Sequence, residues 1–362
     1  MEDMLVLDGL TKTYGDFYAA KKVTLKLKQG EFLTLLGPSG SGKTTTLKMV
    51  AGLEIPTDGH IFVKGEDITY LPPDKRGLGM VFQNYALFPH MTIKENIMFP
   101  LKMKKEKMSK TEMENLAMEY LRLVQLEHVA DRKPSQLSGG QQQRIALARA
   151  LVYSPPIVLM DEPLGALDKK LRGDMQLEIK RIQKKLNITT IYVTHDQEEA
   201  LTMSDRIAIM NKGEIAMMGT PDEIYEKPNS VFVADFIGES NLIPVSLVEK
   251  QKGRVVLKMR TQKESVFAYE VPEQSLPEFS EKTRFVIRPE KMSVGLDLGA
   301  IKKITGTIVD VIYLGESVKY IILVDNEIQI KIKQQAMSGT RIFHEGDSVE
   351  IGWPDDAGQV LN

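Results

Sequence analysis

The chain has 362 residues, too long for one ordinary compact domain, so two or three domains are expected. Its 47 basic and 49 acidic residues give a formal net charge of −2, and this near balance argues against a nucleic-acid-binding surface. There is no cysteine, which excludes disulfides and thiolate metal sites. The first residues lack the basic and apolar regions of a signal peptide, and no apolar stretch is long enough to span a bilayer. We therefore expect a soluble protein that reaches a membrane only through a partner.

Short strands separated by turns are predicted for the first part of the chain. The stretch 4–36 alternates enough to predict strands over residues 4–7, 23–27 and 32–36, the last of them an apolar run. Tyr14 is expected in a polar turn, where an exposed ring can stack on adenine. The other interpretation of Tyr14, an ordinary turn aromatic, stays open from the sequence alone.

A glycine-rich loop follows the third strand and precedes a helix predicted to end at Ala51. Strand, loop and helix in this order are the context of a phosphate-binding loop, which disfavours a chance match. Its glycines let backbone N–H groups approach phosphate oxygens, and the helix start adds a positive dipole end. Lys43 can reach the terminal phosphates, and the Thr44 hydroxyl is placed to ligate Mg²⁺. The predicted nucleotide-binding residues of this loop are Gly37, Pro38, Ser39, Gly40, Ser41, Gly42, Lys43, Thr44 and Thr45.

Two further signals lie in the middle of the chain. The apolar strand 79–82 ends at Gln83, and polar residues at the carboxyl ends of buried strands lie where ligands gather in an open α/β sheet. Residues 137–141, Leu-Ser-Gly-Gly-Gln, precede a helix predicted over 142–151, with Ser138 as a candidate N-cap. The glycines leave the first N–H groups of that helix open to an anion, so this segment is a candidate second phosphate site.

Acidic and imidazole side chains end the next two predicted strands. The apolar strand 157–160 leads into Asp161 and Glu162, where Asp161 would hold Mg²⁺ and Glu162 would orient and deprotonate a water. A strand over 190–193 leads into His195. The alternatives are a solvent-facing acidic pair and a core histidine. Several polar residues at successive strand ends instead favour one shared crevice.

The pattern changes near residues 238–241. Beyond them the sequence predicts mostly short strands, which suggests a small antiparallel barrel and a domain boundary that separates residues 1–236 from 240–362. A barrel that binds oligonucleotides is disfavoured because basic and aromatic residues do not interleave. The strands are expected over 254–259, 265–271, 283–287, 304–314, 318–324, 328–332 and 348–353.

These motifs stand in the order of an ATP-binding cassette (ABC) ATPase, which residues 1 to about 236 closely resemble. The resemblance implies an α/β P-loop NTPase fold of the ABC type, with an antiparallel β subdomain and a helical subdomain at about 92–150. The C-terminal strands resemble the OB-like (TOBE-type) barrel of maltose-type and polyamine-type importer ATPases. That second likeness depends on Arg288-Pro289-Glu290 and on the block from 311 to 347.

The resemblance also assigns roles to residues. Two cassettes of this family pair head to tail and hold ATP and Mg²⁺ between them, with Thr44, Gln83 and Asp161 as the implied metal ligands. Tyr14 would stack on adenine, Gln83 would sense Mg²⁺ and the γ-phosphate, and Glu162 would be the catalytic base. His195 would clamp the γ-phosphate. The residues that would act on the opposite subunit's nucleotide are Ser138, Gly139, Gly140 and Gln141, with Arg132 and Gln136 as weaker candidates.

The implied function is the ATP-hydrolysing subunit of a membrane importer. Its implied partners are a second copy or a paralogous ATPase, integral membrane permease subunits at the cytoplasmic face, and through them an extracytoplasmic substrate-binding protein. Nucleic acid is not an expected partner. Residues 232–241 and the C-terminal barrel blocks look closer to polyamine importers than to sugar importers, while sugars, ferric iron, sulfate and phosphonates remain alternatives. A soluble cassette protein without a transport role is a rival, as is a regulatory module in which the barrel is the working part.

Overall fold

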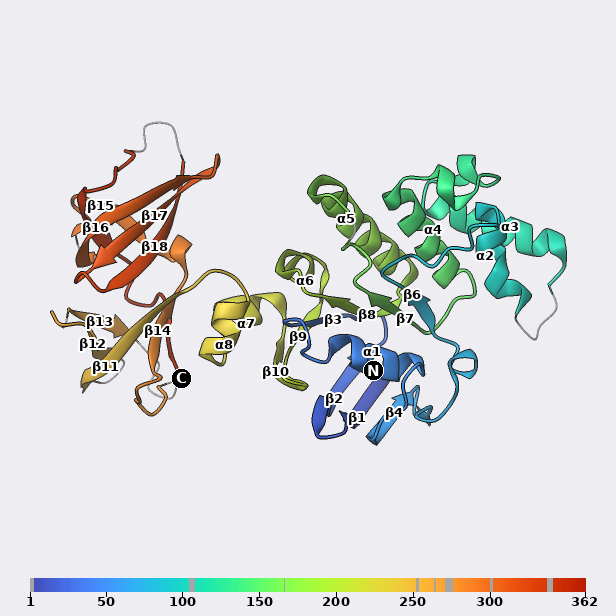
Figure 1. The fold of residues 1–362 in the computed structure, drawn as a ribbon, viewed down its shortest axis with the longest axis horizontal. Helices are drawn as coiled ribbons and strands as arrows, with labels where there is room; N and C mark the ends of the chain where they lie inside the picture. Colours follow the sequence, from blue (N-terminus) through green and yellow to red (C-terminus); the bar gives the residue numbers. More distant parts are fainter. Residues whose placement is uncertain are drawn as a thin grey trace. The chain divides into compact units, whose positions relative to one another are not determined.

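The computed structural model describes residues 3–103, 108–165, 167–251, 254–263, 265–270, 276–299, 302–336 and 341–362. They fall into two compact units, Met1–Ile224 and Tyr225–Asn362 (Figure 1). The two units divide after Ile224, within the helix α7 (Pro221–Glu226), whereas the sequence pattern predicts the domain boundary after residue 236. Residues 225–236 therefore lie in the second unit. Residues 104–107 of the predicted helical subdomain and Val271 of a predicted strand lie outside the described residues.

A mostly parallel sheet organises the first unit. Within the described residues it has six strands in the order β10-β9-β3-β8-β7-β6, of which β10 alone runs antiparallel to its neighbour. β3 is buried along its whole length and β8 is too, as expected for strands with both faces covered. The strands are β3 (Phe32–Leu36), β6 (Gly79–Val81), β7 (Ile157–Asp161), β8 (Thr189–Thr194), β9 (Arg206–Asn211) and β10 (Glu214–Gly219).

A four-stranded antiparallel sheet in the order β2-β1-β4-β5 completes the β layers that the structure describes for this unit. The helix α1 (Lys43–Ala51) lies between the two sheets, and its buried Leu47, Met49 and Val50 share one hydrophobic core with both (Figure 1). The strands are β1 (Asp3–Tyr14), β2 (Phe17–Lys28), β4 (Asp58–Val63) and β5 (Glu66–Asp67).

Helices gather at one side of the parallel sheet, as the green and cyan ribbons of Figure 1 show. The helix α4 begins at Gly139, earlier than the predicted start at 142, because Ser138 and Gln141 form a reciprocal capping box before it. The helices of the first unit not yet given are α2 (Ile93–Lys102), α3 (Lys110–Leu123), α4 (Gly139–Leu151), α5 (Lys169–Leu186) and α6 (Gln197–Met203), with 3₁₀ turns at Pro73–Lys75, Glu127–Val129 and Pro134–Gln136.

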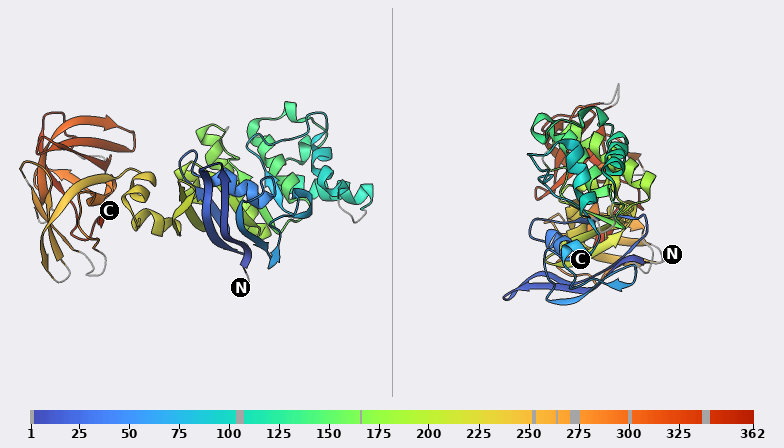
Figure 2. Two further views of the ribbon diagram at one scale, coloured as in Figure 1. Left: turned by 60° about the horizontal axis from the view of Figure 1, so that its bottom comes forward. Right: turned by 90° about the vertical axis from the view of Figure 1, so that its right-hand side faces the viewer.

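The second unit confirms the predicted all-β character of the C-terminal region. After the helix α8 (Val231–Phe236), its described strands form two five-stranded antiparallel sheets, β13-β12-β11-β14-β20 and β15-β19-β16-β17-β18 (Figure 2). Both sheets contribute to one core in which Trp353 packs against Phe267 and Phe285. The strands are β11 (Asn241–Gln251), β12 (Arg254–Met259), β13 (Val266–Glu270), β14 (Arg284–Ile287), β15 (Ser293–Gly295), β16 (Lys302–Tyr313), β17 (Ser317–Val324), β18 (Ile328–Gln335), β19 (Ser348–Gly352) and β20 (Gln359–Leu361).

The motif Arg288-Pro289-Glu290 holds the start of the second unit in place. The Arg288 guanidinium lies 4.2 Å from the centroid of the Tyr225 ring and donates to the carbonyl oxygens of Tyr225 and Ala234. The Tyr225 hydroxyl donates to Glu290 Oε1 at 2.6 Å. This motif therefore has a structural role within the unit. No helix among the described residues is long and apolar enough to cross a membrane.

Candidate active site

Four neighbouring parallel strands carry the predicted catalytic and metal-binding residues to one edge of the sheet. The strand β3 leads into the glycine-rich loop, β6 into Gln83, β7 into Asp161 and Glu162, and β8 into His195. Leu36 pairs with Thr194, and Asp161 pairs with Val193, so these carboxyl ends are level with one another. The crevice predicted from the sequence would therefore lie at the carboxyl edge of this sheet.

The glycine-rich loop is held in a shape that larger residues cannot adopt. Gly42 has a φ of +99°, and a Cβ there would lie 2.2 Å from the carbonyl oxygen of Ala19. A Cβ at Gly37 would lie 2.3 Å from the carbonyl oxygen of Met210. Close approach of the loop to its surroundings therefore requires glycine at both positions.

Lys43 places its charge inside this loop. Its Nζ donates to the carbonyl oxygens of Gly37 and Pro38 at 2.8 and 2.9 Å, and the residue is 5% exposed. Burial lowers the pKa of the Lys43 ammonium, while the nearby charges of Glu162 and Asp161 act in the opposite direction. The loop thus encloses a cation that lies within the concave turn of the backbone.

Thr44 and Asp161 bring two oxygen atoms together beside this cation. Thr44 Oγ1 donates to Asp161 Oδ1 at 3.2 Å. Burial raises the pKa of the Asp161 carboxyl, as does the Glu162 charge, and the hydrogen bond from Thr44 opposes both. Hydroxyl and carboxylate oxygens are the ligands that Mg²⁺ prefers, so this pair fits a magnesium ion shared with phosphate.

Glu162 and His195 face each other across the same edge. His195 Nδ1 lies 3.2 Å from Glu162 Oε2, and the imidazole is 60% exposed. The Glu162 backbone has a φ of +43°, and its N–H donates to the carbonyl oxygen of Val193 at 3.0 Å. A left-handed backbone is uncommon for glutamate, so this bond to the neighbouring strand helps hold the carboxylate in place.

Gln83 and Tyr14 are exposed as well. Gln83 follows β6, and its Nε2 would be 3.8 Å from a Cβ placed on Gly165, in the turn after Glu162. Tyr14 ends β1 rather than lying in a turn, because pairing continues to Phe17 on β2. Its ring is 51% exposed and has Lys12 Nζ 5.1 Å from its centroid. The ring is therefore accessible for stacking, and both roles remain predictions.

In segment 137–141, the neighbours of Gly139 and Gly140 come from outside the glycine-rich loop. A Cβ on Gly139 would meet Leu167 at 3.4 Å and the Tyr85 hydroxyl at 3.9 Å, and one on Gly140 would meet Leu171 at 3.0 Å. Ser138 and Gly139 are exposed, as are Arg132 and Gln136. The Gln136 side chain accepts a hydrogen bond from the Lys133 N–H, so it caps a 3₁₀ turn.

Sequence reasoning missed two residues that hold the loop after Gln83. Arg149, on α4, donates to the carbonyl oxygens of Tyr85 and Ala86 at 3.0 and 2.8 Å, where both residues have positive φ angles. Asn96, fully buried on α2, bonds to the N–H and the carbonyl oxygen of Phe88. An asparagine on the helix face that otherwise carries apolar residues such as Ile93, Ile97 and Leu101 is the signal that could have pointed to this role.

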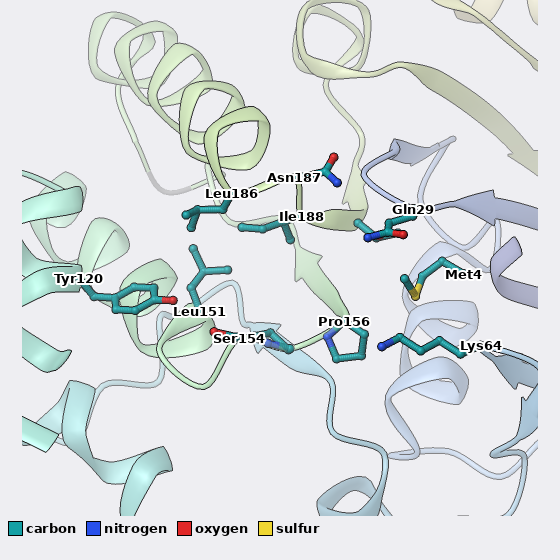
Figure 3. A pocket seen from close by; sticks show the side chains of 12 residues that line it. Met4, Gln29, Lys64, Tyr120, Leu151, Ser154, Pro156, Leu186, Asn187 and Ile188 are labelled. Atoms are coloured by element: carbon teal, nitrogen blue, oxygen red, sulfur yellow. The ribbon is translucent and has the colours of Figure 1, made fainter. Parts of the chain in front are cut away.

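A pocket of about 250 Å³ lies at the other end of the parallel strands (Figure 3). It is lined among others by Pro156 and Thr189, which stand where β7 and β8 begin. Its lining includes none of the predicted site residues. It is therefore separate from the carboxyl edge, where the predicted site residues lie.

Comparisons with known proteins agree with this geometry. Residues 20–165 match the family model of the ABC transporter, and residues 285–361 match the TOBE domain. The spermidine/putrescine import ATP-binding protein PotA of Thermobifida fusca is 46% identical over 98% of this chain and 92% of that protein. PotA of Bacillus cereus is 42% identical over the full length of both. Among solved structures, the dimeric post-hydrolysis state of the ATP-binding cassette MJ0796 bound to ADP and Pi has a TM-score of 0.54 and 37% identity, over 60% of this chain and 99% of that chain.

Proposed function

Because this chain belongs to the ABC family of import ATP-binding proteins and couples ATP hydrolysis to import, we propose that its transported solute is spermidine, putrescine or a closely related polyamine. The observation that carries the proposal is similarity to PotA proteins at 42–46% identity along nearly the whole chain, the C-terminal unit included. The C-terminal unit matters here because the catalytic residues act on ATP in the same way whatever crosses the membrane.

Within this proposal, the carboxyl edge of the parallel sheet holds the triphosphate. Backbone N–H groups of the glycine-rich loop and the Lys43 ammonium bind the β- and γ-phosphates of ATP. Mg²⁺, held by Thr44, Asp161 and Gln83, would neutralise charge on the same phosphate oxygens. The ion pair of Lys43 with phosphate would replace its present bonds to Gly37 and Pro38.

Glu162 and His195 act on the attacking water and the γ-phosphate. The Glu162 carboxylate accepts a proton from water as the water attacks, and its separation of 3.2 Å from His195 supports a shared task. The imidazole donates to the γ-phosphate oxygen that is nearest to it. Tyr14 adds stacking on the adenine.

A second cassette completes each site, either another copy of this chain or a paralogue. Ser138, Gly139, Gly140 and Gln141 then bind the nucleotide held by the partner's glycine-rich loop. Two observations support this: Ser138 and Gly139 are exposed, and the similar MJ0796 cassette is dimeric. The importer is completed by integral membrane permease subunits, which the cassettes bind at the cytoplasmic face, and by an extracytoplasmic substrate-binding protein.

The test is ATP hydrolysis by the complex reconstituted in vesicles with its permease and binding protein. Spermidine or putrescine should stimulate turnover, because a cargo-loaded binding protein favours closure of the two cassettes. Maltose and ferric iron are the matched negative solutes. Stimulation by the sugar and by neither amine would contradict the polyamine proposal and leave the importer ATPase standing.

A further inference from the structure

The turn that carries His195 is fixed on both sides by hydrogen bonds. Asp196 caps α6 through its Oδ1, which accepts from the Glu199 N–H at 3.1 Å. Glu199, 2% exposed, accepts at Oε2 from the Thr194 hydroxyl at 2.7 Å. Thr194 precedes His195 and Asp196 follows it. These bonds therefore fix the position of the His195 backbone, from which the imidazole extends.

An arginine from another helix joins the two carboxylates. Arg172, in the first turns of α5, donates from NH1 to Asp196 Oδ2 at 2.8 Å, and its Nε lies 3.9 Å from Glu199 Oε1. Its NH2 donates to the carbonyl oxygen of Leu167 at 3.1 Å. One guanidinium therefore contacts both the His195 turn and the turn that leads into α5.

The second of these turns begins at the proposed catalytic base. From Glu162 the chain passes Gly165, whose N–H donates to the Glu162 carbonyl oxygen at 3.3 Å, and reaches Leu167. Asp168 then caps α5 by accepting from the Leu171 N–H at 3.0 Å. The Arg172 guanidinium is thus placed between the segment that follows the base and the segment that follows the imidazole.

We propose that Arg172 is a positioning residue for ATP hydrolysis, which holds the His195 turn against the turn after Glu162. This inference rests on the proposed roles of Glu162 and His195. A planar, forked cation can donate to the Leu167 carbonyl oxygen and the Asp196 carboxylate at once while its charge lies near Glu199, so lysine is a partial substitute. Without the cation, Asp196 and the buried Glu199 are left as neighbouring carboxylates, and repulsion between them loosens the turn.

The first measurement is steady-state ATP hydrolysis by the full-length chain assembled with its membrane subunits. Arg172→Ala should lower kcat by about tenfold or more, because small misplacements of catalytic groups are costly, while ATP binding is retained. Arg172→Lys should recover part of the loss. Arg181→Ala is the matched control, since Arg181 is an exposed residue on the same helix that pairs with Glu178, and this substitution should leave kcat unchanged.

A double-mutant cycle separates positioning from general destabilisation. In a His195→Ala background, Arg172→Ala should cause little further loss, because the group that it positions is gone. Asp196→Asn keeps the helix cap and weakens the ion pair, so it gives a folded variant with an intermediate loss if Arg172→Ala does not fold. Losses that simply add, or a wild-type kcat in both Arg172→Ala and Asp196→Asn, would overturn the inference. Full turnover in His195→Ala would instead overturn the proposed site.

Discussion

Glu162→Gln should keep ATP bound and slow its hydrolysis by about 10²-fold or more, because an amide cannot take the proton from the attacking water. Glutamine has the shape of glutamate, so it preserves packing at this left-handed position, and its amide oxygen can still accept a hydrogen bond from His195 Nδ1. The measurement is phosphate release by the assembled complex together with nucleotide binding to the same preparation. The pair of results distinguishes a lost base from a lost binding site.

Glu178→Gln provides the control for this substitution. Glu178 lies on α5 in an ion pair with Arg181, whose side chain is 47% exposed, and loss of that pair should have little effect on turnover. If Glu162→Gln in the complex hydrolysed ATP as fast as the unchanged chain, Glu162 would not be the base. The proposed role of Asp161, the last residue of β7, in Mg²⁺ binding would not be affected by that result.

Lys43→Ala should weaken ATP binding by about tenfold to a hundredfold, the usual cost of losing a hydrogen bond from a charged group. The ammonium lies inside the loop, and burial lowers its pKa, so a phosphate that replaces its carbonyl partners relieves an unfavourable environment. Titration with a fluorescent ATP analogue measures the effect, and a melting curve checks that the loop remains folded.

Lys185→Ala is the control for Lys43, since Lys185 is exposed on α5. Its affinity for the analogue should match that of the unchanged chain. Equal affinity in Lys43→Ala, with a folded protein, would mean that the cation faces something other than the terminal phosphates.

The carboxyl edge of the parallel sheet could be predicted as the position of the site, because the sequence patterns that predict its strands are local. Apolar runs of four or five residues mark β3 and β7 as buried strands, and the residue after each run is then at a strand end. Parallel pairing brings such ends together whatever the loops between them do. Glu162 and His195 were therefore assigned to one crevice although 32 intervening residues separate them in the chain.

The lengths of β1 and β2 could not be predicted, because irregular pairing between the two strands interrupts the alternation of apolar and polar residues in their sequences. Leu10 pairs with Val23 and Lys12 pairs with Ala20, so two residues of β2 stand opposite one of β1. Lys22 has a φ of +48° at this bulge. The polar residues that interrupt the pattern are thus part of the strand.

The residues that support the site escaped prediction for a different reason. Arg149 and Arg172 lie in helices whose sequence periodicity accounts for them as ordinary polar positions. Their partners, the carbonyl oxygens of Tyr85 and Leu167, are backbone atoms that become accessible only when the chain has folded. The spacing of residues in the sequence therefore does not predict such a contact.

The most direct test of the account is the mass in solution of the Glu162→Gln chain with and without ATP and Mg²⁺, measured by light scattering. We expect a monomer without nucleotide and a dimer with ATP, because segment 137–141 of one copy closes the site of the other. Adding Gly139→Glu should abolish the dimer, since it places a negative charge opposite the γ-phosphate. The Cβ of the new residue has only ordinary contacts, to Leu167 at 3.4 Å and to the Tyr85 hydroxyl at 3.9 Å, so the chain should still fold. A protein that binds ATP yet stays monomeric with or without its membrane subunits, or a dimer that survives Gly139→Glu, would contradict the account.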